Sequence, residues 1–353
     1  MKTASELVAR FAGNPILRPA DCRASRADLE VKCLLNPGAF EFRGRVGLLL
    51  RVAEGTIEEE GWLSTPVISS GGDGEVGILR FKRNDPQLRQ TDPRVFCNAG
   101  QTYLTTLSHL RLAWSDDGLL FRIDPQPTLI GSGQLEEYGL EDARVTQIDD
   151  EYFITYTAVS RHGHGVGMIS TKDWQRFTRH GMIFTIPNKD CALLPRRIDG
   201  RYFALHRPSA PGFGGYQIWS AESPDLIHWG RHRPVMGPRE QSWDSFRVGA
   251  GAAPIETSRG WLEIYHGADA ADHYGLGAVL LDINNPSHLL ARTNEPILFP
   301  TAKYETDGFL NGVVFTNGHI VRGDRILVYY GAADSVICLA EMSIDGLLHL
   351  LQE

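Results

Sequence analysis

Two carboxylates and an arginine stand within four consecutive residues, at Glu141, Asp142 and Arg144, shortly before the strand-like segment 152–158. Because a strand presents alternate residues to the same side, Asp142 and Arg144 can face one site together. An acid beside a fixed cation can donate a proton or clamp a ligand in a sugar or phosphate pocket. The same pair can equally be a structural ion pair at the start of a strand.

A second charged group combines Lys189 with His206 and Arg207. Lys189 lies in the segment 188–195, which precedes the strand that carries the other two residues. Three potential cations toward the inner edge of one structural unit would form an anion site, most naturally for phosphate. The structural alternatives are a surface turn at Lys189 and a satisfied core histidine at His206.

Four further residues have unusual surroundings. Arg51 follows three consecutive leucines, so a charge that ends an inner strand there must meet a partner or a ligand. Tyr265 and His266 end another apolar strand and precede a glycine. Asp334 follows small residues, which would let a bulky ligand approach the backbone.

These residues belong to a recurring unit with short apolar strands and little helical periodicity. The strands follow turns rich in Asp, Gly or Arg, a composition typical of the turns that join hairpin strands. They lie at 152–158, 202–207, 261–267 and 326–331. Aromatic-ended Ser/Thr-Asp phrases recur with them at intervals of about 50 residues, which indicates an all-β chain folded as a β-propeller. We expect Tyr156, His206, His266 and Tyr330 to line the mouth of its central funnel.

The number of propeller blades is open from the residues alone. Counting both 46–52 and 103–108 as inner strands gives six units. The alternative is five blades, with residues 70–106 as an inserted hairpin in the first. No linker or change of composition interrupts the chain, so residues 1–353 are expected to form a single domain.

Composition excludes several classes of protein. The formal net charge is −8 and no Lys/Arg run occurs, which argues against nucleic acid or an anionic membrane as a partner. The five cysteines are scattered without a C-x-x-C pair, so we expect neither a disulfide framework nor a zinc site. The N-terminus lacks a secretion signal, and no apolar run approaches the ~20 residues of a membrane span. A cytoplasmic protein is therefore expected.

Short motifs along nearly the whole chain resemble glycoside hydrolase family 130, the β-mannoside phosphorylases and related β-mannosidases. Their order and density make the resemblance specific. They include NPGAF at 36–40, LLLRVAE at 48–54, GLEDARV at 139–145, NKD at 188–190, HRP at 206–208, GAGAAP at 249–254, YHGA at 265–268 and YYGAAD at 329–334.

The resemblance implies a five-bladed β-propeller, and hence an inserted hairpin near residues 70–106. It also assigns Asp142 as the catalytic acid, although Ala143 stands where the family usually has proline. The matching phosphate-binding positions are Arg51, Arg144, Lys189, His206 and Arg207. The matching mannose-binding positions are Asn36, Asp190, Tyr265, His266 and Asp334.

The chemistry implied is inverting phosphorolysis of β-mannosides to α-mannose 1-phosphate, with the proton passing from the acid through a sugar hydroxyl. Inorganic phosphate is the co-substrate, and no metal or organic cofactor is expected. The likeness favours short β-1,2-linked manno-oligosaccharides. The alternatives are a phosphorylase of β-1,4-mannosyl-glucose or mannosyl-N-acetylglucosamine, a β-mannosidase, and a non-catalytic sugar-binding propeller. The sequence leaves open whether the chain forms a homo-oligomer.

Overall fold

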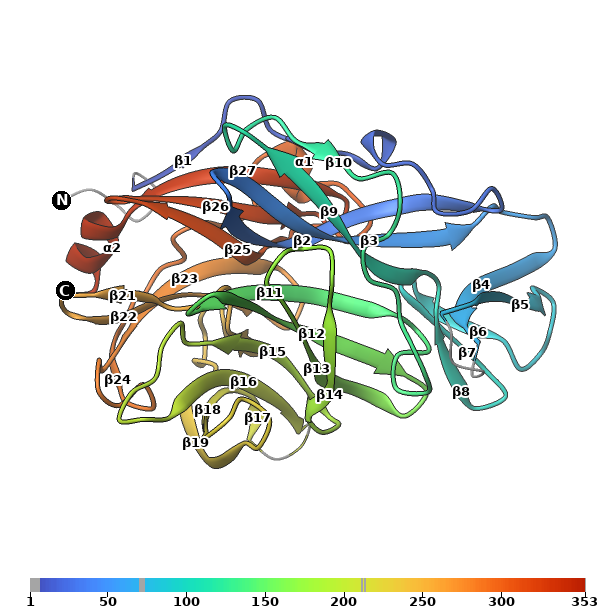
Figure 1. Cartoon of the computed structure of the whole chain (residues 1–353). Coiled ribbons are helices and arrows are strands. Elements are labelled where there is room, and N and C mark those ends of the chain that lie inside the picture. The colour runs from blue at the N-terminus through green and yellow to red at the C-terminus, as the bar shows by residue number, and fades with distance from the viewer. Residues whose placement is uncertain (1–6, 70–73, 211, 213, 353) are drawn as a thin grey trace.

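The computed structural model describes residues 7–69, 74–210, 212 and 214–352. The described chain is almost entirely β-structure (Figure 1), and this confirms the expected all-β class. Its short helical segments are the 3-10 turn η2 (Pro19–Asp21), α1 (Lys303–Thr306) and α2 (Ile344–Leu350). No helix within the described ranges is long and apolar enough to cross a membrane.

Three antiparallel sheets have four strands each. The first contains β2 (Leu29–Phe42), β3 (Arg45–Thr56), β9 (Leu107–Ser115) and β10 (Arg122–Ile123). The second contains β11 (Leu140–Ile148), β12 (Glu151–Ser160), β13 (Gly163–Thr171) and β14 (Thr178–Phe184). The third contains β25 (Val314–Arg322), β26 (Arg325–Ala332), β27 (Val336–Ser343) and, at its outer edge, β1 (Val8–Arg10).

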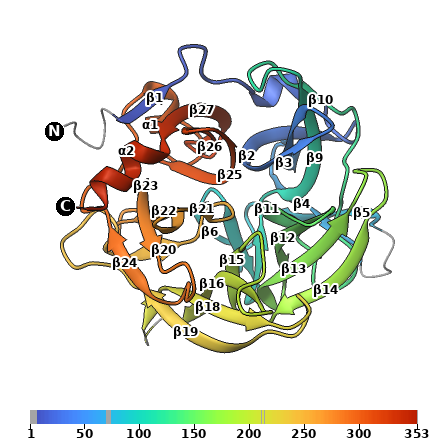
Figure 2. The same cartoon turned by 60° about the vertical axis from the view of Figure 1, so that its left-hand side comes forward.

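A ten-stranded sheet contains two further groups of paired strands of the same kind. We call each of these five groups a run. One run is β15 (Asn188–Leu193), β16 (Tyr202–Ala210), β18 (Ile218–Ser223) and β19 (Gly230–Met236). In the other, β20 (Arg247–Gly249) and β21 (Ile255–Thr257) both pair with β22 (Gly260–Ala268), followed by β23 (Tyr274–Leu281) and β24 (Leu289–Arg292). The short β17 (Gly215–Tyr216) joins the runs because it pairs with β16 and with β20. Figure 2 shows all these runs arranged around a common centre.

Turn residues and apolar packing explain the repetition. Asp149 and Asp199 begin hairpin turns with positive φ angles of 55° and 49°, a conformation that Asp tolerates better than most residues. The hydrophobic clusters bridge neighbouring runs: Leu48 packs in one cluster with Leu327, and Leu110 packs in another with Ile154. Each run therefore buries its faces against its neighbours.

The first strand of four runs carries a register shift at a corresponding place. The shifts lie at 35–38 in β2, 141–144 in β11, 189–192 in β15 and 316–318 in β25. Asn36, Asp142 and Asp190 occupy these bulges with φ angles of 33°, 50° and 54°. A bulge re-aims the side chains beside it, and all three residues line one central cavity.

The apolar strands recognised in the sequence are the second strands of their runs. Three of the four residues expected at the funnel mouth, Tyr156, His206 and Tyr330, do not line the central cavity. The hydroxyl of Tyr156 bonds to Glu136, and that of Tyr330 donates to Glu305 at 2.9 Å. These strands have the strongest hydrophobic signal because a strand flanks each on both sides, whereas the first strands mix small and polar residues.

The insertion in the first run is larger than the expected hairpin. It occupies residues 57–106, between β3 and β9, although positions 70–73 lie outside the described residues. It forms a two-stranded sheet of β4 (Trp62–Ile68) and β5 (Val76–Lys82) and a three-stranded sheet of β6 (Arg89–Asp92), β7 (Val95–Asn98) and β8 (Gln101–Leu104). Figure 1 shows these strands together at the right-hand side of the molecule.

Candidate active site

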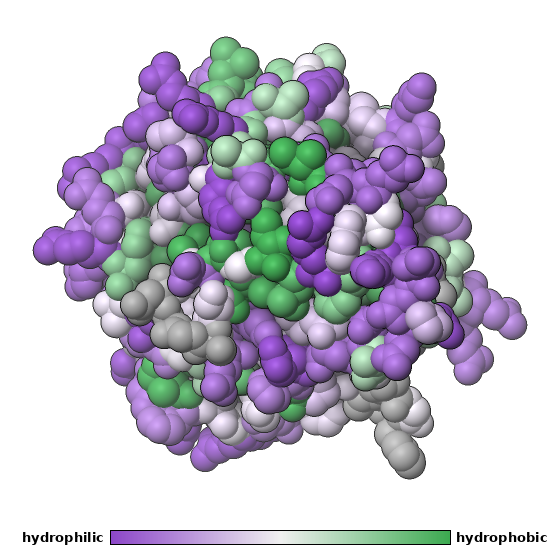
Figure 3. Space-filling model, turned by 90° about the vertical axis from the view of Figure 1, so that its right-hand side faces the viewer, coloured by the Kyte–Doolittle hydropathy of each residue, from purple (hydrophilic) through white to green (hydrophobic). Residues whose placement is uncertain are grey.

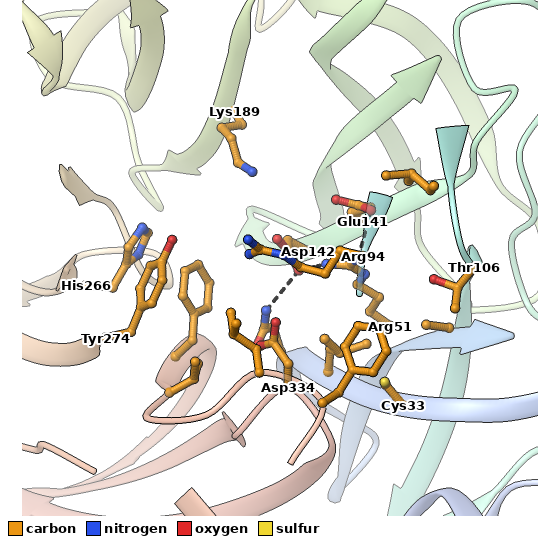
Figure 4. Close-up of a pocket in the computed structure, with 18 of the residues that line it drawn as sticks. Cys33, Arg51, Arg94, Thr106, Glu141, Asp142, Lys189, His266, Tyr274 and Asp334 are labelled. Atoms are coloured by element: carbon orange, nitrogen blue, oxygen red, sulfur yellow. Dashed lines mark hydrogen bonds and ion pairs between the residues drawn. The ribbon is translucent and has the colours of Figure 1, made fainter. Parts of the chain in front are cut away.

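A cavity of about 310 Å³ lies where the first strands converge, and the insertion contributes to its wall. Figure 4 shows its polar side chains, which come from segments far apart in the sequence. The residues that line it are Cys33, Leu35, Asn36, Arg51, Ala53, Asp92, Arg94, Val95, Leu104, Thr106, Glu141, Asp142, Lys189, Asp190, Arg207, His266, Tyr274, Phe309, Leu310, Val313, Phe315 and Asp334.

Asp142 is the central acid of this cavity and is only 5% exposed. Its Oδ1 accepts hydrogen bonds from Asn36 Nδ2 and from Arg51 Nη1, both at 3.0 Å. Burial alone would raise the pKa of Asp142, but the charges of Arg51, Lys189 and Arg144 outweigh burial and lower that pKa. The carboxyl is therefore ionised in the ligand-free protein.

Arg51 joins two carboxylates. While its Nη1 donates to Asp142, its Nη2 donates to Glu141 Oε1 at 2.7 Å and its Nε to Ser108 Oγ at 3.0 Å. The guanidinium plane is thus fixed in orientation. One face of the cavity therefore has a rigid cation already engaged with the acid.

Asp190 organises a second group of side chains, two arginines and a histidine. It is 1% exposed, and its carboxylate meets Arg144 Nη2 at 3.2 Å, Arg207 Nη1 at 3.0 Å and His266 Nε2 at 3.3 Å. Burial opposes ionisation, but Arg207, His266 and Arg144 hold the pKa of Asp190 well below its usual range. Asp190 thereby positions Arg207 and His266 on the cavity wall.

Lys189 differs from the arginines because its side chain has no hydrogen bond or ion pair with any residue that the structure describes. Its ammonium points toward the interior of the cavity in Figure 4. A cation that lines a largely buried cavity without a protein partner is available to an anionic ligand.

Arg144 lies behind this wall and does not line the cavity. It is 1% exposed, and it donates to the backbone oxygens of Asp142, Ala250 and Gly251 at 2.8–2.9 Å. With its bond to Asp190, these contacts engage its guanidinium within the protein. Arg144 therefore holds the first strands together through these backbone contacts.

His206 and Tyr265 also lie outside the cavity lining. The ring of His206 bonds to Asn188 and His232 at 3.0 and 3.2 Å, and burial, with the neighbouring His232, lowers its pKa to about 3. The hydroxyl of Tyr265 donates to Asp244 at 2.8 Å and is fully buried. Successive residues of a strand point to opposite faces. Since Arg207 and His266 face the cavity, their neighbours His206 and Tyr265 face away.

Four polar lining residues were not singled out in the sequence, namely Asp92, Arg94, Thr106 and Tyr274, and Glu141 was named beside Asp142 without a role of its own. Arg94 comes from the insertion and pairs with Asp92 at 2.6 Å. Asp334 lies close to several of these charged side chains. Burial and the charges of Asp142 and Glu141 raise the pKa of Asp334 to about 6, against the opposing charges of Arg51 and Arg94. Arg94 carried no sequence signal because the fold of the insertion alone brings it to the cavity.

Comparisons with known proteins identify the family of this chain. The family model of glycoside hydrolase family 130, described as β-1,4-mannooligosaccharide phosphorylase, matches residues 90–353. The β-1,2-mannobiose phosphorylase of Listeria innocua is 41% identical over 347 residues, which cover 97% of this chain and 98% of that enzyme. A 1,2-β-oligomannan phosphorylase of Thermoanaerobacter sp. is 40% identical over 68% of this chain and 80% of the relative.

The fold of the Listeria innocua relative also matches. The solved structure of the Listeria innocua enzyme in complex with β-1,2-mannobiose superimposes with a TM-score of 0.94, covering 98% of this chain and 99% of that one. The chain belongs to glycoside hydrolase family 130.

Proposed function

We propose that this protein is an inverting phosphorylase of β-1,2-linked manno-oligosaccharides that releases α-mannose 1-phosphate and a shortened sugar. The observation that carries the proposal is the buried acid Asp142, which lies in a cavity that also holds the unpartnered cation Lys189. Two relatives of about 40% identity are phosphorylases named for β-1,2-linked mannosides, and this supports the linkage.

The reaction assigns separate tasks to the acid and to the cations. Asp142 gives a proton, through a sugar hydroxyl, to the glycosidic oxygen as its bond to C1 breaks. A phosphate oxygen forms the new bond to C1 from the opposite face, so the anomeric configuration inverts. Phosphate already carries negative charge and needs cations to hold it, but no strong base.

Phosphate binding also prepares the acid. In the ligand-free protein Arg51 and Lys189 keep the pKa of Asp142 low. An anion beside these cations offsets their field, and this raises the pKa of Asp142 toward the protonated form that catalysis needs.

The remaining residues receive roles according to their positions. We assign phosphate contact to Lys189, Arg207 and Arg51, and contact with the mannosyl unit to Asn36, His266 and Asp334. Arg144, Asp190 and His206 act as positioning residues, and Tyr265 acts through the packing of β22. Their positions in the cavity lining and the hydrogen bonds described above support these roles.

A β-mannosidase is the second candidate, because further carboxylates, among them Glu141 and Asp334, line the same cavity. A hydrolase needs a second carboxylate to activate water. Against this alternative, Glu141 is engaged by Arg51 at 2.7 Å, and Lys189 would then have no anion to hold.

We further propose that the architecture is a five-bladed β-propeller forming one catalytic domain, which the five runs of four or five strands support. The co-substrate is inorganic phosphate, without a metal or organic cofactor. A cytoplasmic location is supported by the five cysteines, all of which are free thiols.

The test is phosphate dependence across a panel of substrates. β-1,2-Mannobiose, β-1,4-mannobiose and 4-O-β-D-mannosyl-D-glucose are each incubated with and without phosphate. We expect cleavage of the β-1,2-linked sugar only with phosphate, and its loss by at least about a hundredfold in Asp142→Asn. Cleavage without phosphate would favour the hydrolase, and preference for a β-1,4-linked sugar would overturn the linkage.

A further inference from the structure

A second hollow of about 420 Å³ adjoins the catalytic cavity. Thr106 and Phe309 line both, so the two spaces share a wall. We call this hollow the side groove. Its other lining residues include Glu58, Trp62, Arg83 and Gln90, from the insertion. Figure 3 views the molecule from the side that carries the insertion and shows hydrophobic residues near the centre of this face, surrounded by hydrophilic ones.

The side groove combines an aromatic ring with free polar groups. Trp62 is held from one side by Arg80, whose guanidinium carbon lies 4.6 Å from the ring centroid and which pairs with Glu59. The side chains of Glu58, Arg83 and Gln90 make no hydrogen bond with the described part of the chain. A fixed aromatic face with nearby hydrogen-bonding groups suits a sugar ring, which has apolar C–H faces and a polar rim.

The stereochemistry of the reaction indicates on which side of the cavity the leaving sugar lies. The attacking phosphate and the leaving sugar must lie on opposite faces of the reacting carbon. Lys189 and Thr106 lie on different sides of Asp142 in Figure 4. With phosphate on the Lys189 side, the leaving sugar lies toward Thr106 and Phe309, which also line the side groove.

We propose that the side groove binds the mannosyl units of the leaving portion that lie beyond the one at the cleaved bond. The enzyme accordingly acts on β-1,2-manno-oligosaccharides of three or more units in preference to the disaccharide. This inference rests on the proposed function, since the direction of the leaving sugar follows from phosphate at Lys189.

The experiment compares kcat/KM for β-1,2-linked mannobiose, mannotriose and mannotetraose at saturating phosphate. The wild-type protein is expected to prefer the longer sugars. Trp62→Ala should lower kcat/KM for the tri- and tetrasaccharide by about three- to tenfold and leave that for mannobiose unchanged. Trp62→Phe keeps a flat aromatic face and should retain most of the preference.

Glu58→Ala is a second test, because this exposed loop residue has no described partner whose loss would disturb folding. It should weaken the longer substrates only. Equal kcat/KM for all lengths in the wild type, or an equal loss for all lengths in Trp62→Ala, overturns the inference and leaves the proposed function intact. No phosphorolysis at any length refutes the proposed function and the inference with it.

Discussion

At the scale of single residues, the division between engaged and free cations distinguishes the cavity. Arg51 and Arg207 are each paired with a buried carboxylate, whereas Lys189 has no partner in the described chain. A paired cation exchanges one partner for another when phosphate binds, while a free cation gains a partner. Lys189 should therefore contribute most selectively to phosphate affinity.

Lys189→Ala should raise KM for phosphate by about tenfold and change KM for the sugar much less, because the lost contact is with the anion. Initial rates over a matrix of phosphate and mannobiose concentrations measure both constants. Lys172→Ala is the matched control, since Lys172 pairs with Asp150 on the surface. An unchanged phosphate dependence in Lys189→Ala would remove this residue from the phosphate site.

Asp334 should make stability depend on pH. Its folded-state pKa of about 6 lies above its ordinary value, chiefly because of burial. A raised pKa contributes stability that is present in acid, below the unfolded pKa, and is lost as pH rises through about 6. Asp334→Asn removes this loss, so its melting temperature should exceed that of the wild type above pH 6 and converge with it near pH 4.

Thermal unfolding between pH 4 and 8 measures the difference. Asp116→Asn is the control, because the side chain of Asp116 is 88% exposed. A difference in melting temperature that does not vary with pH in Asp334→Asn would contradict the raised pKa.

The sequence identified many of the cavity residues but not which neighbours face inward. Arg207 and His266 line the cavity, whereas the adjacent His206 and Tyr265 do not. Simple alternation explains these two pairs once the inward-facing residue is known. It fails at Lys189 and Asp190, which are adjacent and both line the cavity, because a bulge interrupts the strand there. A register shift depends on the partner strand, so one sequence does not reveal it.

At the scale of elements, close approach between first and second strands sets the positions of the site residues. Gly249 in β20 lies opposite His266 in β22. A Cβ atom at Gly249 would lie 2.4 Å from His266 Nε2 and 2.5 Å from Asp190 Oδ2. This contact is far inside van der Waals distance, so a side chain at this position would have to displace the Asp190–His266 pair.

Gly249→Ala should therefore lower kcat/KM by about tenfold or more, because a shift of roughly 1 Å in site geometry is costly to catalysis. Gly230→Ala in β19 is the matched control, since a Cβ there meets no atom within 4 Å. The two variants are compared by steady-state kinetics and thermal unfolding. Equal activity in both would show that the Asp190–His266 pair does not need its present position.

The insertion shows a second limit of the sequence at this scale. The sequence predicts that an insertion exists, but it places the start near residue 70 instead of 57. Trp62–Ile68 is an apolar segment that continues the pattern of the preceding strands, yet it pairs with β5 alone. Pairing partners decide where an insertion begins, and local propensity does not contain them.

At the scale of the whole molecule, segments from the two ends of the described chain pair in one sheet. β1 near the N-terminus pairs with β27, and the C-terminal segment ends as α2. Arg10 of β1 donates to Glu305 Oε1 at 2.8 Å and to the backbone oxygen of Phe299 at 2.8 Å. The carboxylate of Glu305 is fully buried, so it needs hydrogen-bond donors from the protein, and Arg10 is the charged one.

Arg10→Ala should destabilise the protein by about 1–3 kcal/mol, because it leaves the buried carboxylate of Glu305 short of a charged partner. Despite burial, Arg10 and the backbone donors of Thr301 and Ala302 lower the pKa of Glu305. The stabilisation is therefore present at neutral pH and is lost as pH falls through that lowered value.

Chemical denaturation at pH 7 and at progressively lower pH measures both the size and the trend. Arg322→Ala removes an exposed ion pair with Glu41 and should cost only about 0–1 kcal/mol. A loss in Arg10→Ala no larger than in Arg322→Ala would contradict the role of Arg10 as the charged partner of buried Glu305.

The most direct test of phosphate as the nucleophile counts the products of one cleaved bond. β-1,2-Mannobiose and phosphate are incubated with the enzyme, and the products are followed by ¹H and ³¹P NMR. Attack by phosphate predicts one α-mannose 1-phosphate and one mannose for each disaccharide consumed. Two mannose molecules and no phosphate ester would show that water attacks instead, and Lys189 and its neighbours would then not hold the nucleophile.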